Sequence, residues 1–341
     1  MVDPNPLINQ NSFTLTEPNN IKENNSNNNS IDVEHNNKEE NDSKNSEQII
    51  EEEVCPSETK WTVKCRFFGL NYVEIENTSL RFCNWWQCLP MMPIFVGILI
   101  IVMYIQFLFL LYPRCRTFSF KLSGIILISF FGFLFFICYF RTAFTDPGFL
   151  PFNWNLTRRF SYSWEEQLNG LAVTKSQVDY AKKHRPPSSS FSTFSGRFVI
   201  RADHICGWVS NWIGQRNHKF FFLMTFYGSI YAILLLLWQC FVKDSLDGWK
   251  NIANLVACAF QFLFGFFMFG MFVTSFNDLL HSRTQITSYK REETVNEGCF
   301  QAMEHVFGYG CKLCWFCPVS PFPNGLDQAL NYSDIQSLPD N

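Results

Sequence analysis

A four-residue stretch from Asp203 to Cys206 places a carboxylate, an imidazole and a thiol close together in the chain (D-H-I-C). Only the thiolate form of cysteine attacks a thioester, and His204, two residues away, is a reasonable base for Cys206. Asp203 could orient the imidazole and stabilise its positive charge. The set therefore suits nucleophilic catalysis through a covalent thioester, although one such tetrad alone is more often an ordinary polar loop.

A second group of thiols lies near the C-terminus, where Cys311, Cys314 and Cys317 form a C-x2-C-x2-C run. This spacing is found in metal and cluster sites, but a fourth ligand is not evident. Cysteines in a tail beside a membrane more often pack against apolar side chains or become acylated. Metal binding is therefore the minor interpretation of this run.

Four long apolar runs could span a bilayer and place the tetrad next to it. Hydrophobic residues make up 47% of the 341-residue chain and charged residues only 17%, with 39 Phe, 11 Tyr and 10 Trp. The runs are Pro93 to Tyr112, Leu122 to Phe140, Phe220 to Val242 and Ile252 to Phe276. Each meets, within about two residues, the requirement of about 20 residues for a bilayer-spanning helix. The sequence predicts an all-α membrane protein with four transmembrane helices and a cytosolic loop between spans 2 and 3.

The distribution of basic residues predicts the orientation of the spans. The 141–219 loop carries 11 Lys and Arg and the 60–92 segment carries 4, whereas the two short opposite loops carry 3 and 2. By the positive-inside rule, both termini and the long loop face the cytosol. The compartment is expected to be an endomembrane (Golgi or ER) or the plasma membrane. The spans themselves contain no Asp, Glu, Lys, Arg or His, which disfavours a pump or an ion-coupled transporter.

The remaining segments complete the expected domain organisation. Residues 1–53 hold 12 Asp and Glu against 3 Lys, together with 14 Asn, a composition too polar to form a core. Lys and Arg elsewhere lie beside apolar runs and form no continuous stripe, so no nucleic-acid partner is expected. The segments are a disordered acidic tail (1–59), a juxtamembrane segment that approaches the bilayer without crossing it (60–92), spans 1 and 2 (93–140), the cytosolic loop (141–219), spans 3 and 4 (220–276) and a cytosolic C-terminal tail (277–341).

The loop resembles the DHHC-type protein S-acyltransferases, or palmitoyltransferases. Asp203, His204 and Cys206 match the Asp, the first His and the Cys of that family's signature, and Ile205 replaces the second His. The likeness covers roughly residues 90 to 320, in the right order around four spans. Its other matches are Asp146 to Gly148 (DPG), Arg185 to Pro187 (RPP), Trp208, Val209, Asn211, Gly214, Asn217, Phe220, Thr284 to Thr287 (TQIT for TTxE), Gly298, Val306 to Gly308, Trp315 and Pro318.

The resemblance implies a two-step reaction. Cys206 would take a long-chain acyl group, such as palmitoyl from palmitoyl-CoA, as a thioester and pass it to a cytosolic cysteine of a membrane-associated protein. His204 would be the general base and Asp203 its orienting partner. Asn217, Trp208 and Thr284 are candidate acyl-CoA-binding or supporting positions. The alternative is a catalytically inactive relative that serves as a membrane scaffold or acyl-CoA-binding partner.

The family's loop normally holds two zinc ions, and this chain departs from it there. The whole 141–219 loop has one Cys and three His, so a four-ligand site would consume Cys206 and His204. We therefore expect no zinc and no other metal site. An apolar cluster of Phe191, Phe194, Phe198, Ile205 and Trp212 is expected to replace the metal. The family's ligand positions here read Val178, Ala181, Ser190 or Phe191, Ser192, Ser195, Phe198, Ile205 and Trp212.

Overall fold

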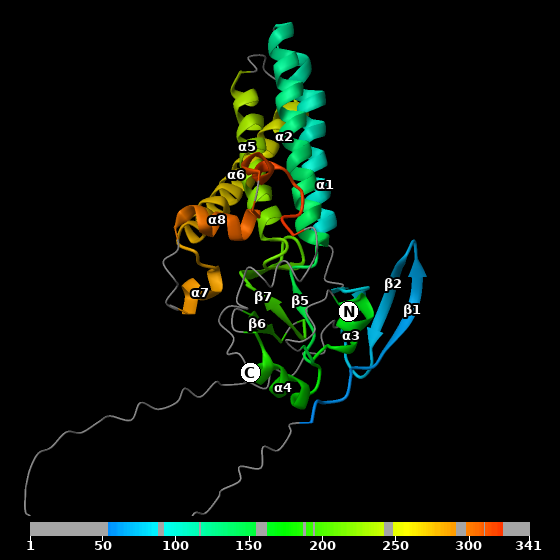
Figure 1. Ribbon diagram of the computed structural model, residues 1–341. Helices are drawn as coiled ribbons and strands as arrows, with labels where there is room; N and C mark the ends of the chain where they lie inside the picture. Colours follow the sequence, from blue (N-terminus) through cyan, green and yellow to red (C-terminus); the bar gives the residue numbers. More distant parts are fainter. Residues whose placement is uncertain are drawn as a thin grey trace, which may run out of the picture. The chain divides into compact units, whose positions relative to one another are not determined.

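The computed structural model describes residues 54–87, 92–115, 117–154, 162–186, 189–193, 195–241, 248–290, 298–309 and 311–322. The acidic tail lies outside these residues except for its last six. Four helical stretches are long and apolar enough to cross a membrane (Figure 1). They are α1 (Met92–Gln106, continued by the short turns η1 Phe107–Leu111 and η2 Tyr112–Arg114), α2 (Phe118–Phe144), α5 (His218–Phe241) and α6 (Trp249–Leu280). The four predicted spans are confirmed, and α6 extends beyond the predicted run at both ends.

Helix α5 is the centre of this bundle, since it packs against both α2 and α6. Two glycines let α2 approach it closely. A Cβ atom on Gly124 would lie 2.5 Å from Trp238, and one on Gly132 would lie 2.9 Å from Tyr231. Neither distance leaves room for a side chain, so large aromatic side chains of α5 occupy the space beside both glycines.

The loop between α2 and α5 forms a small mixed domain. Its helices are α3 (Trp164–Asn169) and α4 (Lys175–His184), and each begins with a capping box. Strands β5 (Phe149–Leu150), β7 (Arg197–Ile200) and β6 (Ser189–Ser192) form an antiparallel sheet in that order. Strands β8 (His204–Cys206) and β9 (Asn211–Ile213) form a separate hairpin. Leu150, Phe152, Phe198 and Ile200 are the centre of the domain's core.

The predicted juxtamembrane segment contains a four-stranded antiparallel sheet, in the order β1 (Trp61–Phe67), β2 (Leu70–Ile75), β3 (Arg81–Cys83) and β4 (Trp86–Gln87). Val73, Ile75 and Phe82 pack against Leu168 and Leu171 of the loop domain. Residues 61–87 of the segment therefore contain strands and no helix. The expectation of an all-α protein holds for the spans, and the protein is mostly helical, but strands β1 to β9 lie outside the bundle.

The chain after α6 returns to the bundle through α7 (Gln285–Lys290), α8 (Cys299–Phe307) and the 3₁₀ turn η3 (Lys312–Phe316). Lys219 Nζ donates to the carbonyl of Cys314 at 2.8 Å. The Tyr227 hydroxyl donates to the carbonyl of Phe316 at 2.5 Å. Because both donors belong to α5, the C-terminal segment is attached to the same helix that follows the loop domain.

Candidate active site

Strand β8 holds Cys206 where the loop domain meets the spans. The side chain is buried, and it belongs to the same apolar cluster as Tyr139 of α2 and Phe221 of α5. The Tyr139 hydroxyl donates to the carbonyl of Trp208 at 2.8 Å, which ties the turn after Cys206 to α2. The thiol therefore lies at the side of the loop domain that meets the spans.

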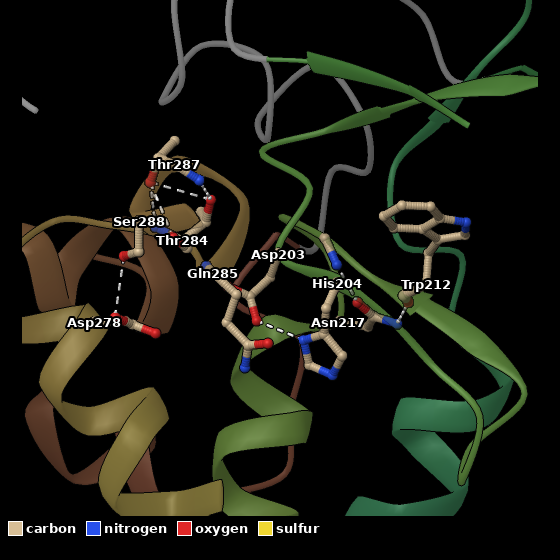
Figure 2. Close-up of polar contacts among 10 residues, drawn as sticks. Asp203, His204, Trp212, Asn217, Asp278, Thr284, Gln285, Thr287 and Ser288 are labelled. Carbon is tan, nitrogen blue, oxygen red and sulfur yellow. Dashed lines mark hydrogen bonds and ion pairs between the residues drawn. The ribbon is translucent and has the colours of Figure 1, made fainter. Parts of the chain in front are cut away.

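The neighbouring acid and imidazole are hydrogen-bonded. His204 Nδ1 lies 2.7 Å from Asp203 Oδ2, and Figure 2 shows the two side chains pointing toward each other. An ionised carboxylate only accepts hydrogen bonds, so Nδ1 carries the proton. His204 Nε2 is buried and forms no hydrogen bond of ordinary geometry, which leaves it free to accept a proton. The edge of the ring packs against Phe221, with centroids 4.9 Å apart.

The protonation states of this pair are set by opposing effects. Burial alone would raise the pKa of Asp203, but the His204 hydrogen bond, the charges of His218 and His204, and the Gln285 N–H lower it overall. Burial alone would lower the pKa of His204, but its interactions with Asp203 and with the nearby Cys206 thiol raise it to about 9. The environment therefore favours an imidazolium that faces a carboxylate on one side and a thiol on the other.

This pair predicts a pH-dependent contribution to stability. The folded pKa of His204 is raised from 6.5 to about 9, so the stabilisation is complete below pH 6.5 and disappears as the pH rises through 9. Its upper limit is about 3 kcal/mol. Thermal unfolding of wild type and His204→Gln should differ most near pH 6 and least near pH 10. His184→Gln, which alters an exposed ring bonded to a backbone carbonyl, is the control. A difference in melting temperature between wild type and His204→Gln that is the same at all pH values would contradict the pairing of His204 with Asp203.

The TQIT segment holds Asp203 from the other side. The backbone N–H of Gln285 donates to Asp203 Oδ1 at 2.8 Å. Thr284 and Thr287 bond each other in the same turn, with the Thr284 N–H donating to Thr287 Oγ1 at 2.8 Å (Figure 2). Thr284 thus shapes the turn that delivers an N–H to the acid, which makes it a supporting residue.

Two asparagines fasten the loop domain to the end of α2. Asn211 Nδ2 lies within hydrogen-bonding distance of three carbonyls there, those of Thr142, Ala143 and Thr145. Asn217 is fully buried; it accepts from the N–H of Gly214 and donates to the carbonyls of Thr142 and Trp212. With both polar ends engaged, Asn217 also supports the site. Trp208 packs against Phe267 of α6 at 5.2 Å and remains partly exposed at this surface.

Asp146, the Asp of the DPG motif, holds a place for which no site role was predicted. Asp146 Oδ1 accepts from the N–H groups of Gly148 and Phe149, both at 2.9 Å. Its Oδ2 accepts from Gln167 Nε2 at 3.0 Å and from Arg216 Nη1 at 3.1 Å. The motif match had pointed to this residue, and the structure shows that it anchors the entrance of the loop domain.

Sequence reasoning also missed Arg197, which is fully buried on β7. Its Nη1 donates to the carbonyl of Trp85 at 3.0 Å and to Gln167 Oε1 at 3.1 Å. The guanidinium lies 3.7 Å from the ring centroid of Phe149 and 5.3 Å from that of Phe82. Burial lowers its pKa to about 9, so it stays charged at neutral pH. An arginine opening the apolar run RFVI was the only sequence signal.

The residues at the family's zinc positions do not fit a zinc ion. Val178, Ala181, Phe198 and Ile205 carry no ligand atom. Within the described ranges, no three His, Cys, Asp or Glu side chains converge closely enough to hold a metal, and this includes Cys311, Cys314 and Cys317. No step of the chemistry is therefore assigned to zinc.

The aromatic cluster expected in place of the metal is only partly correct. The rings of Phe191 and Phe198 pack at 5.6 Å in the domain core. Trp212 packs instead in a second cluster with Phe149 and Val199. Ile205 is 47% exposed, because its side chain alternates with the inward-facing His204 and Cys206 on a two-stranded hairpin. Phe194 lies outside the described residues.

Purified protein is expected to contain far less than one zinc ion per chain, measured by elemental analysis. Removing a structural zinc would destabilise a small domain strongly. Because no structural zinc is expected in this protein, a strong chelator should leave its melting temperature unchanged. Stoichiometric zinc together with a melting temperature that falls on chelation would contradict the prediction.

Comparison with known proteins agrees with this site. The family model for the DHHC palmitoyltransferase matches residues 174–292. Palmitoyltransferase ZDHHC3-A of Danio rerio is 26% identical over 230 residues, which are 62% of this chain and 70% of the relative. Probable protein S-acyltransferase 13 of Arabidopsis thaliana is 28% identical over 224 residues, 58% and 74% of the two chains. Palmitoyltransferase ZDHHC3 of Homo sapiens is 25% identical over 252 residues, 68% and 82% of the two chains. The family model and these relatives together support membership of the DHHC family of protein S-acyltransferases.

Proposed function

We propose that this protein is a membrane-bound protein S-acyltransferase that moves a long-chain acyl group from acyl-CoA to cysteines of protein substrates. The observation that carries the proposal is the arrangement of β8, where an Asp203–His204 pair with a 2.7 Å hydrogen bond is followed by the buried Cys206 thiol at the edge of the spans. The thiolate is the attacking species, and the imidazole of His204 interacts with the Cys206 thiol as the base for its proton.

The reaction would proceed in two balanced steps. In the first, His204 Nε2 holds the proton that Cys206 has given up, and the Cys206 thiolate attacks the thioester carbonyl of acyl-CoA. The bond from that carbonyl to the CoA sulfur breaks, and CoA leaves as a thiolate that takes the proton from Nε2. In the second, a substrate cysteine gives its proton to His204 Nε2 and attacks the Cys206 thioester as a thiolate. The new thioester forms, the bond from the acyl carbon to the Cys206 sulfur breaks, and Cys206 leaves as a thiolate beside the protonated imidazole. Asp203 keeps the imidazole in the tautomer that both steps require.

The spans offer a place for the acyl chain. A groove of ≈ 520 Å³ lies between α1 and α2, with Tyr231 of α5 at its inner wall. Its lining is almost entirely apolar and includes Phe136 and Phe133 of α2. Phe136 lies three residues along α2 from Tyr139, about 4.5 Å of helix. Such a groove suits a hydrocarbon chain whose thioester stays near Cys206.

The acceptor proteins and the host membrane are inferred from the position of Cys206 and from the charge distribution. Acceptors are expected to be membrane-associated proteins with cytosolic cysteines, since Cys206 lies at the face of the bundle that carries the loop domain. Both termini are placed in the cytosol by the charge distribution, and the host membrane is an endomembrane (Golgi or ER) or the plasma membrane.

Autoacylation of the purified full-length protein with a labelled long-chain acyl-CoA tests the proposal. Label that hydroxylamine removes should appear on wild type and be absent from Cys206→Ala. A variant with Cys311, Cys314 and Cys317 all replaced by Ala is the matched control and should keep its label. Equal labelling of wild type and Cys206→Ala would refute the assignment of the nucleophile.

The second candidate is an inactive relative that binds acyl-CoA without transferring the acyl group. It is favoured by the absence of zinc ligands around β8 and by Gly207, which follows Cys206 and lies in open space, since a Cβ atom added there would meet no other atom within 4 Å. Both features reduce the constraints on the nucleophile, and catalysis tolerates little misplacement. Saturable binding of acyl-CoA with no hydroxylamine-sensitive label would support this candidate.

A further inference from the structure

The turn that joins β1 to β2 exposes an apolar surface unlike the rest of the sheet. Phe67, Phe68 and Leu70 are 69%, 92% and 53% exposed, and the rings of Phe67 and Phe68 contact each other at 4.6 Å. We refer to residues 65–70, Cys-Arg-Phe-Phe-Gly-Leu, as the hairpin tip. Apart from this contact with Phe67, the ring of Phe68 is exposed.

The register of the sheet shows where the hairpin tip points. Trp61 is paired with Ile75 at one end, and this end packs on α3, with the rings of Trp61 and Trp164 at 5.5 Å. Closer to the tip, one row of paired residues runs across all four strands. This row consists of Cys65, Tyr72, Cys83 and Trp86.

Trp86, at the end of that row, packs against Phe144, the last residue of the spanning helix α2, at 5.1 Å. The strands therefore run from the loop domain toward the membrane boundary. The hairpin tip continues in the same direction for two more residues of β1, about 7 Å beyond this row. In Figure 1 the β1 arrowhead, which marks this end of the hairpin, is on the same side of the loop domain as the helix bundle.

The backbone conformation of the hairpin tip is one that large side chains seldom adopt. Phe68 and Gly69 both have positive φ, 46° and 79°, a turn geometry that favours Asn-Gly. The other two turns of this sheet place Asn77 and Asn84 at their positive-φ positions. Only the hairpin tip puts a large aromatic residue there, where the backbone is strained and the ring is in water.

The charges around the hairpin tip suit a phospholipid surface. Residues 65–70 contain no acidic residue and one arginine, Arg66, whose side chain is exposed. The nearest carboxylate along β2, Glu74, is already paired with Lys64 at 3.4 Å and Arg81 at 3.0 Å in the middle of the sheet. A long arginine side chain beside apolar rings can reach lipid phosphates while the rings lie deeper.

We propose that the hairpin tip inserts Phe67, Phe68 and Leu70 into the headgroup region of the leaflet next to the loop domain, with Arg66 on lipid phosphates. The sheet is tied to the loop domain through Thr59, which donates to the carbonyl of Leu171, and through Arg197, which donates to that of Trp85. The inserted tip is thus a further membrane attachment for the domain that carries Cys206, in addition to α2 and α5. This role does not depend on acyl transfer.

The test places an environment-sensitive fluorescent amino acid at position 68 of the full-length protein, reconstituted in vesicles of phosphatidylcholine and phosphatidylserine. Blue-shifted emission and quenching by lipids brominated near the headgroup are expected. The same label at position 77, in the exposed turn at the opposite end of β2, is the matched control and should show neither. Absence of quenching at position 68, or equal quenching at both positions, would overturn the proposal, as would a blue shift that persists without lipid because a second protein copy covers the tip.

A second measurement uses trypsin, which cleaves after Arg66. In vesicles, cleavage of wild-type protein after Arg66 should be several-fold slower than cleavage of Phe68→Asn protein at the same bond. Asn is favoured at the positive-φ position, so this variant keeps the turn while losing the ring. Equal cleavage rates, with both proteins showing the same melting temperature, would also overturn the proposal.

Discussion

Asp203→Asn protein is expected to form its acyl-enzyme about 10²- to 10⁴-fold more slowly than wild type at neutral pH. The wild-type carboxylate accepts the proton on His204 Nδ1 at 2.7 Å. An amide at this place would keep its oxygen as the acceptor of the Gln285 N–H and turn its NH₂ group, a hydrogen-bond donor, toward Nδ1. The imidazole would then carry its proton on Nε2, the atom that must receive the proton of Cys206, and its charged form would lose its partner. The measurement is the single-turnover rate of labelling with acyl-CoA.

The nearby Asp278→Asn variant is the matched control for this prediction. Asp278 lies at the end of α6 and faces Ser288 Oγ at 3.3 Å, and it does not contact His204 (Figure 2). Removing its charge changes the same region without changing the imidazole's tautomer, so its labelling rate should stay within about threefold of wild type, well below the effect of one lost acid–base contact. Equal rate losses in the two variants, or a normal rate in Asp203→Asn, would show that Asp203 does not act through His204.

The candidate site was largely readable from the sequence because its key residues are neighbours in the chain. Asp203, His204 and Cys206 lie on or beside one short strand, so their proximity needs no knowledge of the fold. The contacts that hold Asp203 were not readable in the same way. Gln285 reaches it from 82 residues away through a backbone N–H, and a backbone group leaves no trace in the residue type at its position.

The fold was predictable where a single physical requirement dominates. A bilayer demands about 20 uncharged residues per helix, and all four spans were found. The 60–92 segment has no such constraint. Its strands alternate imperfectly, its hairpin tip is apolar and exposed, and its core forms only by packing on Leu168 and Leu171. A sheet whose stability depends on a partner distant in sequence cannot be inferred from local pattern alone.

The same long-range dependence explains why the replacement for zinc was misplaced. Phe191, Ile205 and Trp212 were grouped because they occupy former ligand positions, but hairpin alternation sends Ile205 to the surface. The described structure instead brings β5, β7 and the N-terminal sheet together around Arg197, a charged residue that hydrophobic pattern analysis excludes from a core. The loop domain is thus connected by hydrogen bonds and ring contacts across three chain segments.

Arg197→Ala is accordingly expected to lower the free energy of unfolding of the loop domain by about 3–5 kcal/mol. The substitution leaves a cavity beside the rings of Phe149 and Phe82. It also removes the donor bonded to the carbonyl of Trp85 and to Gln167 Oε1. Each buried acceptor left without a donor costs about 1–3 kcal/mol. In detergent, the apparent melting temperature should fall by roughly 6–20 °C.

Two further substitutions separate the causes of this loss. Arg185→Ala removes an exposed arginine of the same domain and should change the free energy of unfolding by less than about 0.5 kcal/mol. Arg197→Met fills most of the space without a charge, so it should recover the part of the loss that comes from the cavity but not the part that comes from the two acceptors. If Arg197→Ala melts within about 2 °C of wild type, the difference expected for a surface substitution, the buried guanidinium is not what joins the N-terminal sheet to the domain that carries Cys206.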